Sequence, residues 1–259
     1  MRAPFRVAVI TGASSGLGAT LATAYAGPQT ALGLIGRNRE RLDATATACR
    51  TAGATVESAA IDVADGPALA AWLAEFDRAH PVELVIANAG TSAGPQPDQP
   101  GEPAEATLKQ LSTNLLGAVH TVAPLVPPMC ARGRGRIVVI ASIAAYRGLA
   151  YSPGYCASKA GVRAYGEALR AQLAPHGVGV TVVCPGFFGS PMTDRWQGPT
   201  PFLLSGEQAA RRIKRGIDNG RRRISFPWPL VVAMRFCDLA PAIIGDEIVR
   251  RFRFNIRPG

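Results

Sequence analysis

The chain has 259 residues, of which 47% are hydrophobic and 18% are charged, and this predicts one globular domain (1–259) with a full hydrophobic core. Most of its formal net charge of +10 lies in residues 211–259, where twelve Lys or Arg and four Asp or Glu give a net +8. This positive charge could bind an anionic membrane surface, a phosphate-bearing substrate or nucleic acid. It could equally form a basic surface that contacts only solvent.

The cysteines and the uncharged stretches argue against a disulfide-linked, a metal-binding or a membrane-spanning protein. Five cysteines are scattered and form no Cys-x-x-Cys pair, so we expect reduced thiols, a cytoplasmic location and no metal site. Residues 110–131 and 171–193 lack charged side chains but contain Pro, Gly and hydroxyl residues, so neither is expected to span a membrane. Residues 1–4 lead directly into an apolar run, and no signal peptide is expected.

The first predicted unit is a strand, a glycine-rich turn and a helix. Residues 5–11 (FRVAVIT) form a β-branched apolar run, which is typical of a buried parallel strand. The sequence TGASSGLG follows at 11–18, and a helical pattern covers 19–26. Glycines between a strand and a helix let backbone N–H groups approach a pyrophosphate. The alternative is an ordinary glycine-rich turn without a ligand.

The second predicted strand, 31–35, bears on the choice of cofactor. An acidic residue at its end would bind the ribose of NAD, whereas a nearby arginine can pair with a 2′-phosphate. No acid stands at Gly36, and Arg37 and Arg39 follow at the start of a predicted helix over 38–53. We therefore expect NADP(H) rather than NAD(H), unless both arginines are ordinary surface residues.

Strand and helix patterns alternate through the next part of the chain. Strands are predicted at 56–63, 84–87, 135–142, 178–184 and 224–227. Helices are predicted at 67–79, 108–131, 153–173 and 207–219, and a loop rich in Pro, Gly and Gln is predicted at 91–105. This alternation predicts an α/β fold with a Rossmann-like, doubly wound parallel sheet of about seven strands and helices on both faces.

Tyr155 and Lys159 are the candidate catalytic pair. Four residues apart, they fall on one face of the predicted helix. A free phenol has a pKa of about 10, and a nearby ammonium lowers that pKa by favouring the phenolate. Ser142, at the end of a predicted strand, could hydrogen-bond the same substrate oxygen. The spacing alone occurs by chance in many helices, but the glycine turn, Ser142 and the turn at 185–186 should gather at one sheet edge, where ligands bind.

In combination, these motifs resemble those of the short-chain dehydrogenases/reductases over roughly residues 5–190. The shared motifs are TGASSGLG at 11–18, Asp62, Asn-Ala-Gly at 88–90, Asn114, Ser142, Tyr155 with Lys159, and Pro185-Gly186. The resemblance implies that Tyr155 is the catalytic acid or base and that Lys159 lowers its pKa and binds the nicotinamide ribose. It also implies that Ser142 holds the substrate oxygen and that Asn114 positions a water in a proton relay.

The resemblance further implies a cofactor site. Its expected residues are Gly12, Ser14, Ser15, Gly16, Leu17, Gly18, Arg37, Asp62, Val63, Asn88, Ala89, Gly90, Tyr155, Lys159, Pro185, Gly186 and Ser190. Three positions depart from the family pattern: Ser190 stands for a common Thr, Ala87 for a common Asn, and Ser14 for a basic residue of NADP-preferring members. The last departure leaves Arg37 as the main support for NADP(H).

The remainder of the chain is expected to shape the substrate site. Residues 187–223 form a variable segment whose aromatic and aliphatic side chains suit an apolar pocket or lid, and equally core or dimer contacts. Residues 228–259 form a basic and apolar C-terminal extension, similar to those of short-chain reductases that act on lipid-like substrates. This extension could be an interfacial helix on an anionic membrane, or a dimerisation arm over the partner's substrate site.

The expected function is NADP(H)-dependent interconversion of a ketone and a secondary alcohol on an apolar or lipid-like small molecule, such as a 3-oxoacyl or sphingoid lipid, a steroid-like ring or a polyketide-type ketone. One alternative is a reductase or dehydrogenase of a sugar or capsule-polysaccharide precursor. Another is an NADP-binding regulatory or scaffold protein, since fold does not fix function. We expect a homodimer or homotetramer in the cytoplasm, with peripheral membrane contact as an option and no nucleic-acid partner.

Overall fold

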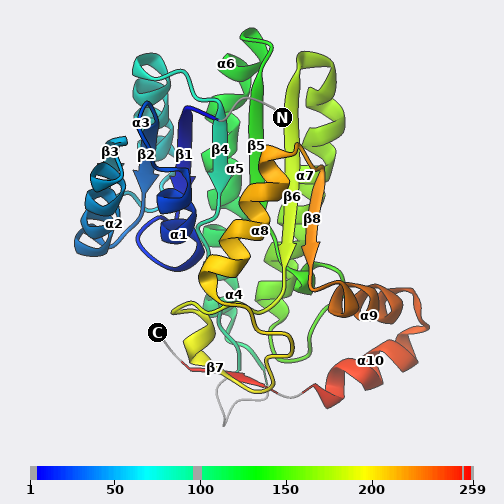
Figure 1. Cartoon of the computed structure of the whole chain (residues 1–259). Helices are drawn as coiled ribbons and strands as arrows, with labels where there is room; N and C mark the ends of the chain where they lie inside the picture. The colour runs from blue at the N-terminus through cyan, green and yellow to red at the C-terminus, as the bar shows by residue number, and fades with distance from the viewer. Residues whose placement is uncertain (1–4, 96–100, 253, 258–259) are drawn as a thin grey trace.

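The structure, a computed structural model, describes residues 5–95, 101–252 and 254–257. A seven-stranded parallel sheet in the order β3-β2-β1-β4-β5-β6-β8 confirms the expected Rossmann-like architecture (Figure 1). Its strands are β1 (Val7–Thr11), β2 (Ala31–Ile35), β3 (Thr55–Ala59), β4 (Leu84–Ala87), β5 (Gly135–Ile140), β6 (Val178–Pro185) and β8 (Arg223–Phe226).

The sheet begins in its middle, because β1 pairs with both β2 and β4. The chain first runs outward to β3, then crosses back and continues from β4 to β8. Where the strand order reverses in this way, a crevice opens at the carboxyl ends of the strands. The topology therefore places the expected ligand site between the ends of β1 and β4.

Helices cover both faces of the sheet (Figure 1). One layer consists of α1 (Gly16–Tyr25), α2 (Arg39–Thr51) and α8 (Gly206–Asp218). The other includes α3 (Gly66–Ala79), α5 (Gly117–Val122) and α7 (Pro153–Leu173). Because both faces are covered, the central strands carry apolar side chains on both sides, and β4 is buried along its whole length.

The connection from β4 to β5 is helical but irregular. The predicted helix over 108–131 is a series of short elements: α4 (Ala104–Gln110), a π-helical turn (Leu111–Leu116), α5, a 3₁₀ turn (Ala123–Leu125) and α6 (Val126–Ala131). Prolines at 124, 127 and 128 cannot donate a backbone hydrogen bond, which interrupts the regular helix there. The predicted loop over 91–105 overlaps α4, and its residues 96–100 lie outside the described part of the chain.

The predicted strand over 56–63 is wrong at its carboxyl end, because β3 ends at Ala59. The carboxylate of Asp62 accepts a hydrogen bond from the Ala64 N–H at 3.0 Å, and the Asp62 carbonyl accepts one from the Asp65 N–H at 2.9 Å. These bonds close a turn, so Asp62 and Val63 lie beyond the end of the strand.

The residues after β8 form two helices and a strand rather than one interfacial helix. α9 (Trp228–Leu239) and α10 (Ala242–Arg251) are separated at Pro241, and we call them together the C-terminal hairpin (228–251). β9 (Asn255–Ile256) then pairs antiparallel with β7 (Trp196–Gln197) in the variable segment. Figure 1 shows the hairpin and this strand pair at the carboxyl end of the sheet.

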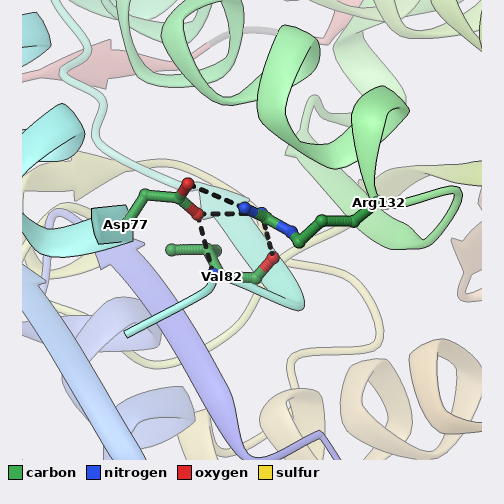
Figure 2. Close-up of polar contacts among 3 residues, drawn as sticks. All are labelled: Asp77, Val82 and Arg132. Carbon is green, nitrogen blue, oxygen red and sulfur yellow. Dashed lines mark hydrogen bonds and ion pairs between the residues drawn. The ribbon is translucent and has the colours of Figure 1, made fainter. Parts of the chain in front are cut away.

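An ion pair joins α3, the approach to β4 and the end of α6 (Figure 2). The two Nη atoms of Arg132 each donate to the Asp77 carboxylate at 2.8 Å, which also accepts from the Val82 N–H at 2.8 Å. Arg132 Nη2 further donates to the Val82 carbonyl at 3.1 Å. This bidentate pair fixes the start of β4 relative to two helices.

Asp77→Ala should lower the free energy of unfolding by about 2 kcal/mol, because it removes charge-assisted hydrogen bonds and leaves a partly buried N–H without its acceptor. Arg134→Ala is the matched control, since it removes a 3.7 Å pair of an exposed guanidinium with Glu83 and should leave stability nearly unchanged. Chemical denaturation measures both variants. Equal losses in the two would contradict the assigned role of the bidentate pair.

Candidate active site

A cleft of about 580 Å³ lies at the carboxyl ends of β1 and β4. All the predicted catalytic and cofactor residues line it except Gly18 and Asn114. The topology thus brings together residues that are far apart in the sequence, from the glycine turn to Ser190. Residues that the sequence analysis did not single out also contribute, most notably Arg41.

The glycine turn leaves room for a ligand at the start of α1. Gly12 has a φ of +68°, and a Cβ atom there would lie 2.8 Å from the Ala89 Cα. A Cβ on Gly18 would overlap the Gly12 carbonyl, so Gly18 serves the packing of α1 against the turn rather than the cleft wall. The Asn88 amide donates to the Thr11 carbonyl at 3.0 Å and ties the turn to β4. This backbone cradle at a helix N-terminus fits the pyrophosphate of a dinucleotide.

Two arginines and one carboxylate lie at the far end of the cleft, beside β2. Arg37 Nη1 is 3.5 Å from a carboxylate oxygen of Asp62, and both side chains are exposed. Arg41 lines the cleft, whereas Arg39, which the sequence analysis considered, does not. The Asn38 side chain accepts from the Arg41 N–H at 2.8 Å and caps α2, which places Arg41 in the first helical turn. Its place at the start of the predicted helix, close in sequence to Arg37, was the available sequence signal.

The proton-transfer groups meet where α7 leaves the sheet edge. Tyr155 lies in the first turn of α7, and Ser142 follows β5. Burial raises the pKa of the Tyr155 phenol to about 12, and its hydrogen bond with Ser142 acts in the opposite direction. Burial is the largest cause of this shift, and the expected effect of Lys159 on the pKa of the phenol stays a prediction. The Ser142 hydroxyl also accepts from the Ala144 N–H at 3.2 Å, which fixes its position.

Lys159 is buried beside Tyr155. Its Nζ donates to the Ile140 carbonyl at 2.8 Å and lies 5.8 Å from the centre of the Tyr155 ring. Burial lowers the pKa of this ammonium to about 8. Gly90 borders this ammonium, since a Cβ there would lie 3.4 Å from Nζ. The lysine is therefore held as a cation between the phenol and the cleft at neutral pH.

Asn114 lies behind the cleft, in the π-helical turn, and is almost fully buried. Its amide donates to the Thr91 carbonyl and to the Ser158 hydroxyl, both at 2.9 Å, and its oxygen accepts from the Thr91 N–H at 2.7 Å. Both amide N–H groups thus have protein acceptors. Asn114 joins the β4 loop to α7 next to Lys159, and its role in a water relay stays a prediction.

A second cavity, of about 250 Å³, adjoins the cleft. Ser142 and Tyr155 line both, so the proton-transfer groups stand at the junction. Its walls are mostly apolar, and among the described residues no charged side chain lines it. Six lining residues carry a hydroxyl group, namely Ser92, Ser142, Ser152, Tyr155, Ser190 and Thr193. Side chains from the variable segment, the C-terminal hairpin and β9 contribute, including Phe187, Trp196, Leu230, Met234, Val249, Phe252 and Ile256.

The C-terminal extension covers the cavity of its own chain. The Trp196 and Phe254 rings stack at 3.9 Å, and the Arg257 N–H donates to the Arg195 carbonyl at 2.9 Å beside the β7–β9 pair. The apolar residues of the variable segment fall into two groups. Phe187, Phe188 and Trp196 line the cavity, whereas Phe202 and Leu203 are exposed. No local signal in the sequence distinguishes these two groups.

Comparisons with known proteins agree with this geometry. Residues 6–199 match the family model described as short chain dehydrogenase. The chain is 36% identical over 250 residues to an uncharacterized oxidoreductase of Myxococcus xanthus, with 96% of this chain and 98% of that protein covered. It is 35% identical over 187 residues to the ketoacyl reductase HetN of a Nostoc species, with 70% of this chain and 63% of that protein covered.

Among solved structures, a short chain dehydrogenase/reductase from Burkholderia phymatum in complex with NAD superposes with a TM-score of 0.82 at 24% identity, covering 100% of this chain and 99% of that one. This likeness supports the fold. The family model covers most of the chain and the Myxococcus relative nearly all of it. The chain therefore belongs to the short-chain dehydrogenase/reductase family of oxidoreductases.

Proposed function

We propose that this protein is an NADP(H)-dependent oxidoreductase that interconverts a ketone and a secondary alcohol on an apolar substrate. The observation that carries the proposal is the position of Ser142 and Tyr155. They stand between a cleft that fits a dinucleotide and a cavity whose described lining is mostly apolar and carries no charged side chain. A regulatory or scaffold protein would not need these groups at such a junction.

In this proposal the nicotinamide cofactor supplies or accepts the hydride, and the protein supplies the proton and the orientation. The Ser142 hydroxyl holds the substrate oxygen, and the Tyr155 phenol gives its proton to that oxygen during reduction. The raised pKa of Tyr155 keeps the proton on the phenol at neutral pH. The Lys159 ammonium stabilises the phenolate that forms, and Asn114 positions α7 through Ser158.

NADP(H) is the proposed cofactor because the adenosine end of the cleft is basic. Arg37 and Arg41 both line it, and no acid stands at Gly36 to bind an unphosphorylated ribose. Asp62 partly neutralises Arg37, whereas no carboxylate partner is found for Arg41 among the described residues. Two guanidinium groups can pair with a 2′-phosphate from two directions.

Arg41→Ala should weaken NADPH binding roughly tenfold and leave NADH binding within about twofold, because it removes one charge-assisted contact with the 2′-phosphate. Arg37→Ala should act in the same direction and by less, since Asp62 already shares its charge. Arg39→Ala is the matched control, because this neighbouring arginine does not line the cleft. Fluorescence titration with both cofactors gives the dissociation constants. Equal weakening of NADPH and NADH would refute the proposed preference.

A ketoacyl or polyketide-type ketone is the proposed substrate class, and the ketoacyl reductase HetN among the relatives supports it. The cavity disfavours a sugar or a sugar nucleotide, since its mostly apolar wall leaves many substrate hydroxyls without a hydrogen-bond partner and its described lining offers no cation to a diphosphate. The basic surface noted in the sequence lies on α8 and β8, outside this cavity.

The substrate class can be tested by following NADPH oxidation with a matched panel. We expect turnover with a 3-oxoacyl thioester and with cyclic apolar ketones, and kcat/KM at least roughly 100-fold lower with ketoses of similar size, because their hydroxyl groups would lose hydrogen bonds to water in the cavity. A preference for ketoses would replace the proposed substrate class by the sugar alternative. Tight NADPH binding without turnover on any ketone would favour a sensor.

The chain is proposed to act in the cytoplasm, as the uneven number of unpaired cysteines suggests. Within the described residues, no helix has the length and apolar character needed to cross a bilayer. Family members typically form oligomers, and a homodimer or homotetramer is proposed for this chain too.

A further inference from the structure

The start of α7, which carries Tyr155, is held by a side chain from another element. Ser152 precedes the helix but does not cap it, because its hydroxyl donates to the Ala93 carbonyl at 3.2 Å. Instead, one carboxylate oxygen of Glu102 accepts from the Gly154 N–H at 3.1 Å. A carboxylate suits this position, since the first N–H groups of a helix have no partner within it and carry partial positive charge. The backbone directly before Tyr155 is therefore fixed from outside the helix.

The other oxygen of Glu102 accepts a hydrogen bond from the side-chain amide of Gln110. Gln110 is the last residue of α4 and is only 1% exposed. Its own side-chain oxygen accepts from the Ala93 N–H at 2.9 Å. A buried amide is costly unless it is hydrogen-bonded, so these partners determine how the side chain lies. Glu102 and Gln110 together thus join the loop after β4 to the first turn of α7.

This pair repeats, one helical turn earlier, the arrangement of Asn114. The Asn114 side chain accepts from the Thr91 N–H at 2.7 Å and donates to the Ser158 hydroxyl at 2.9 Å, so it also joins the loop after β4 to α7. Gln110 lies four residues before Asn114, and residues at this spacing share one side of a helix. The sequence motifs assign a role to Asn114 but none to Gln110 or Glu102.

Close packing makes the first turn of α7 sensitive to this pair. A Cβ atom on Gly154 would lie 2.7 Å from a carboxylate oxygen of Glu102 and 2.9 Å from the Thr107 Cα, so only glycine allows this approach of α4 to α7. A closely packed contact transmits a displacement instead of absorbing it. A change in how Glu102 lies would therefore move the start of α7.

The groups next to the pair belong to the site, although the pair itself does not. Tyr155 lines both the cleft and the cavity, and Ser92 and Ser152 line the cavity. Glu102 and Gln110 line neither. Any effect of the pair on the reaction must therefore pass through the position of other groups. Misplacement by about 1 Å can lower a rate roughly 100-fold.

We propose that Glu102 and Gln110 are positioning residues for proton transfer. They hold the first turn of α7 and thereby keep the Tyr155 phenol at the junction of cleft and cavity. The catalytic part of this inference rests on the proposed function. The arrangement requires one carboxylate and one amide, because both oxygens of Glu102 accept, whereas Gln110 accepts with its oxygen and donates with its nitrogen.

Exchanging the two residue types tests this requirement with little change in side-chain volume. Glu102→Gln would turn two amide NH₂ groups toward each other, and Gln110→Glu would do the same with two carboxylates. Each should lower the single-turnover rate roughly tenfold and leave the dissociation constant of NADPH within about twofold. The variant with both changes regains a donor facing an acceptor, and its rate should return to within about threefold of wild type. Glu105→Gln, at an exposed carboxylate on α4, is the matched control and should keep the wild-type rate.

Hydrogen–deuterium exchange provides a second measurement that needs no substrate. Amides at 154–157 should exchange faster in both single variants and at the wild-type rate in the double variant and in Glu105→Gln, because a held helical turn opens less often. Unchanged protection of the sheet strands shows that each variant keeps its fold. If the wild type reduced no ketone, the proposed function would fail, and this measurement alone would decide whether the pair holds the turn.

Three results would overturn the inference. One is wild-type protection of residues 154–157 in both single variants. Another is faster exchange there with an unchanged single-turnover rate, which would make the pair structural only. The third is a double variant as slow as the slower single variant, since the two side chains would then not act together.

Discussion

Tyr155→Phe should lower kcat roughly 1,000-fold or more and change the dissociation constant of NADPH by less than about twofold. The variant loses only the phenolic oxygen, which carries the transferred proton in the proposed mechanism, and positioned general acids contribute up to about 10⁴-fold. The ring still packs beside Lys159, so the cofactor cleft keeps its shape. Stopped-flow measurement of a single turnover, with the ketone that the panel identifies, separates the chemical step from product release.

Tyr165→Phe provides the matched control for this substitution. Tyr165 lies on the same helix, packs against the hydrophobic core and lines neither the cleft nor the cavity. Its kcat should stay within about twofold of wild type, since no proton passes through it. Comparable activity of Tyr155→Phe and Tyr165→Phe would show that another group gives the proton.

Lys159→Met should lower kcat roughly 100-fold, because it removes the cation that stabilises the phenolate. The effect has a pH signature, since burial lowers the pKa of Lys159 to about 8. Tyr155 keeps its proton well above this pH, so kcat/KM for reduction should be level below about pH 8 and fall above it as Lys159 loses its charge. The fall in kcat/KM above this pH should be absent in Lys159→Met. A wild-type profile that stays level to pH 9.5 would contradict the role of the cation.

The same substitution should stabilise the fold at neutral pH. The pKa of Lys159 is lower in the folded state than its ordinary value of 10.5, so burying the charged form costs stability below about pH 8. Methionine lacks that cost, and thermal unfolding at pH 7 should therefore occur at a higher temperature. The difference should shrink between pH 8 and 10.5, where the folded wild type no longer carries the buried charge. Lys109→Met, at an exposed position on α4, should show neither effect.

The doubly wound parallel sheet and most of the cleft could be predicted because the signals are local. A glycine turn between a strand and a helix requires only residues 5–26, and the alternation of patterns then places every later turn at the same edge. The end of β3 could not be predicted in this way. Its strand-like pattern continues through Ile61 and Val63, and only the hydrogen bonds of Asp62 close the turn earlier.

The substrate cavity was the least predictable part of the site, because it depends on contacts between distant segments. β9 pairs with β7, and Phe254 stacks on Trp196, although neither short strand has a distinctive pattern. The sequence placed apolar residues in both segments but could not show which of them face inward. The net pKa of Tyr155 could not be predicted either, since the amount of water that the fold removes from the phenol cannot be read from a Tyr-Lys spacing.

Part of the cavity wall comes from residues 228–252 and 256, whereas the proton-transfer groups come from other elements. Substrate preference and catalytic chemistry can therefore change separately in evolution. The cleft and the proton-transfer groups belong to the sheet edge, while part of the cavity wall belongs to the stretch after β8. Substitutions in that stretch can alter which molecule is accepted without moving the groups that transfer the proton. Exchange of this stretch between relatives should therefore transfer substrate preference as a module, and a descendant of this chain could acquire a new substrate while its chemistry stays the same.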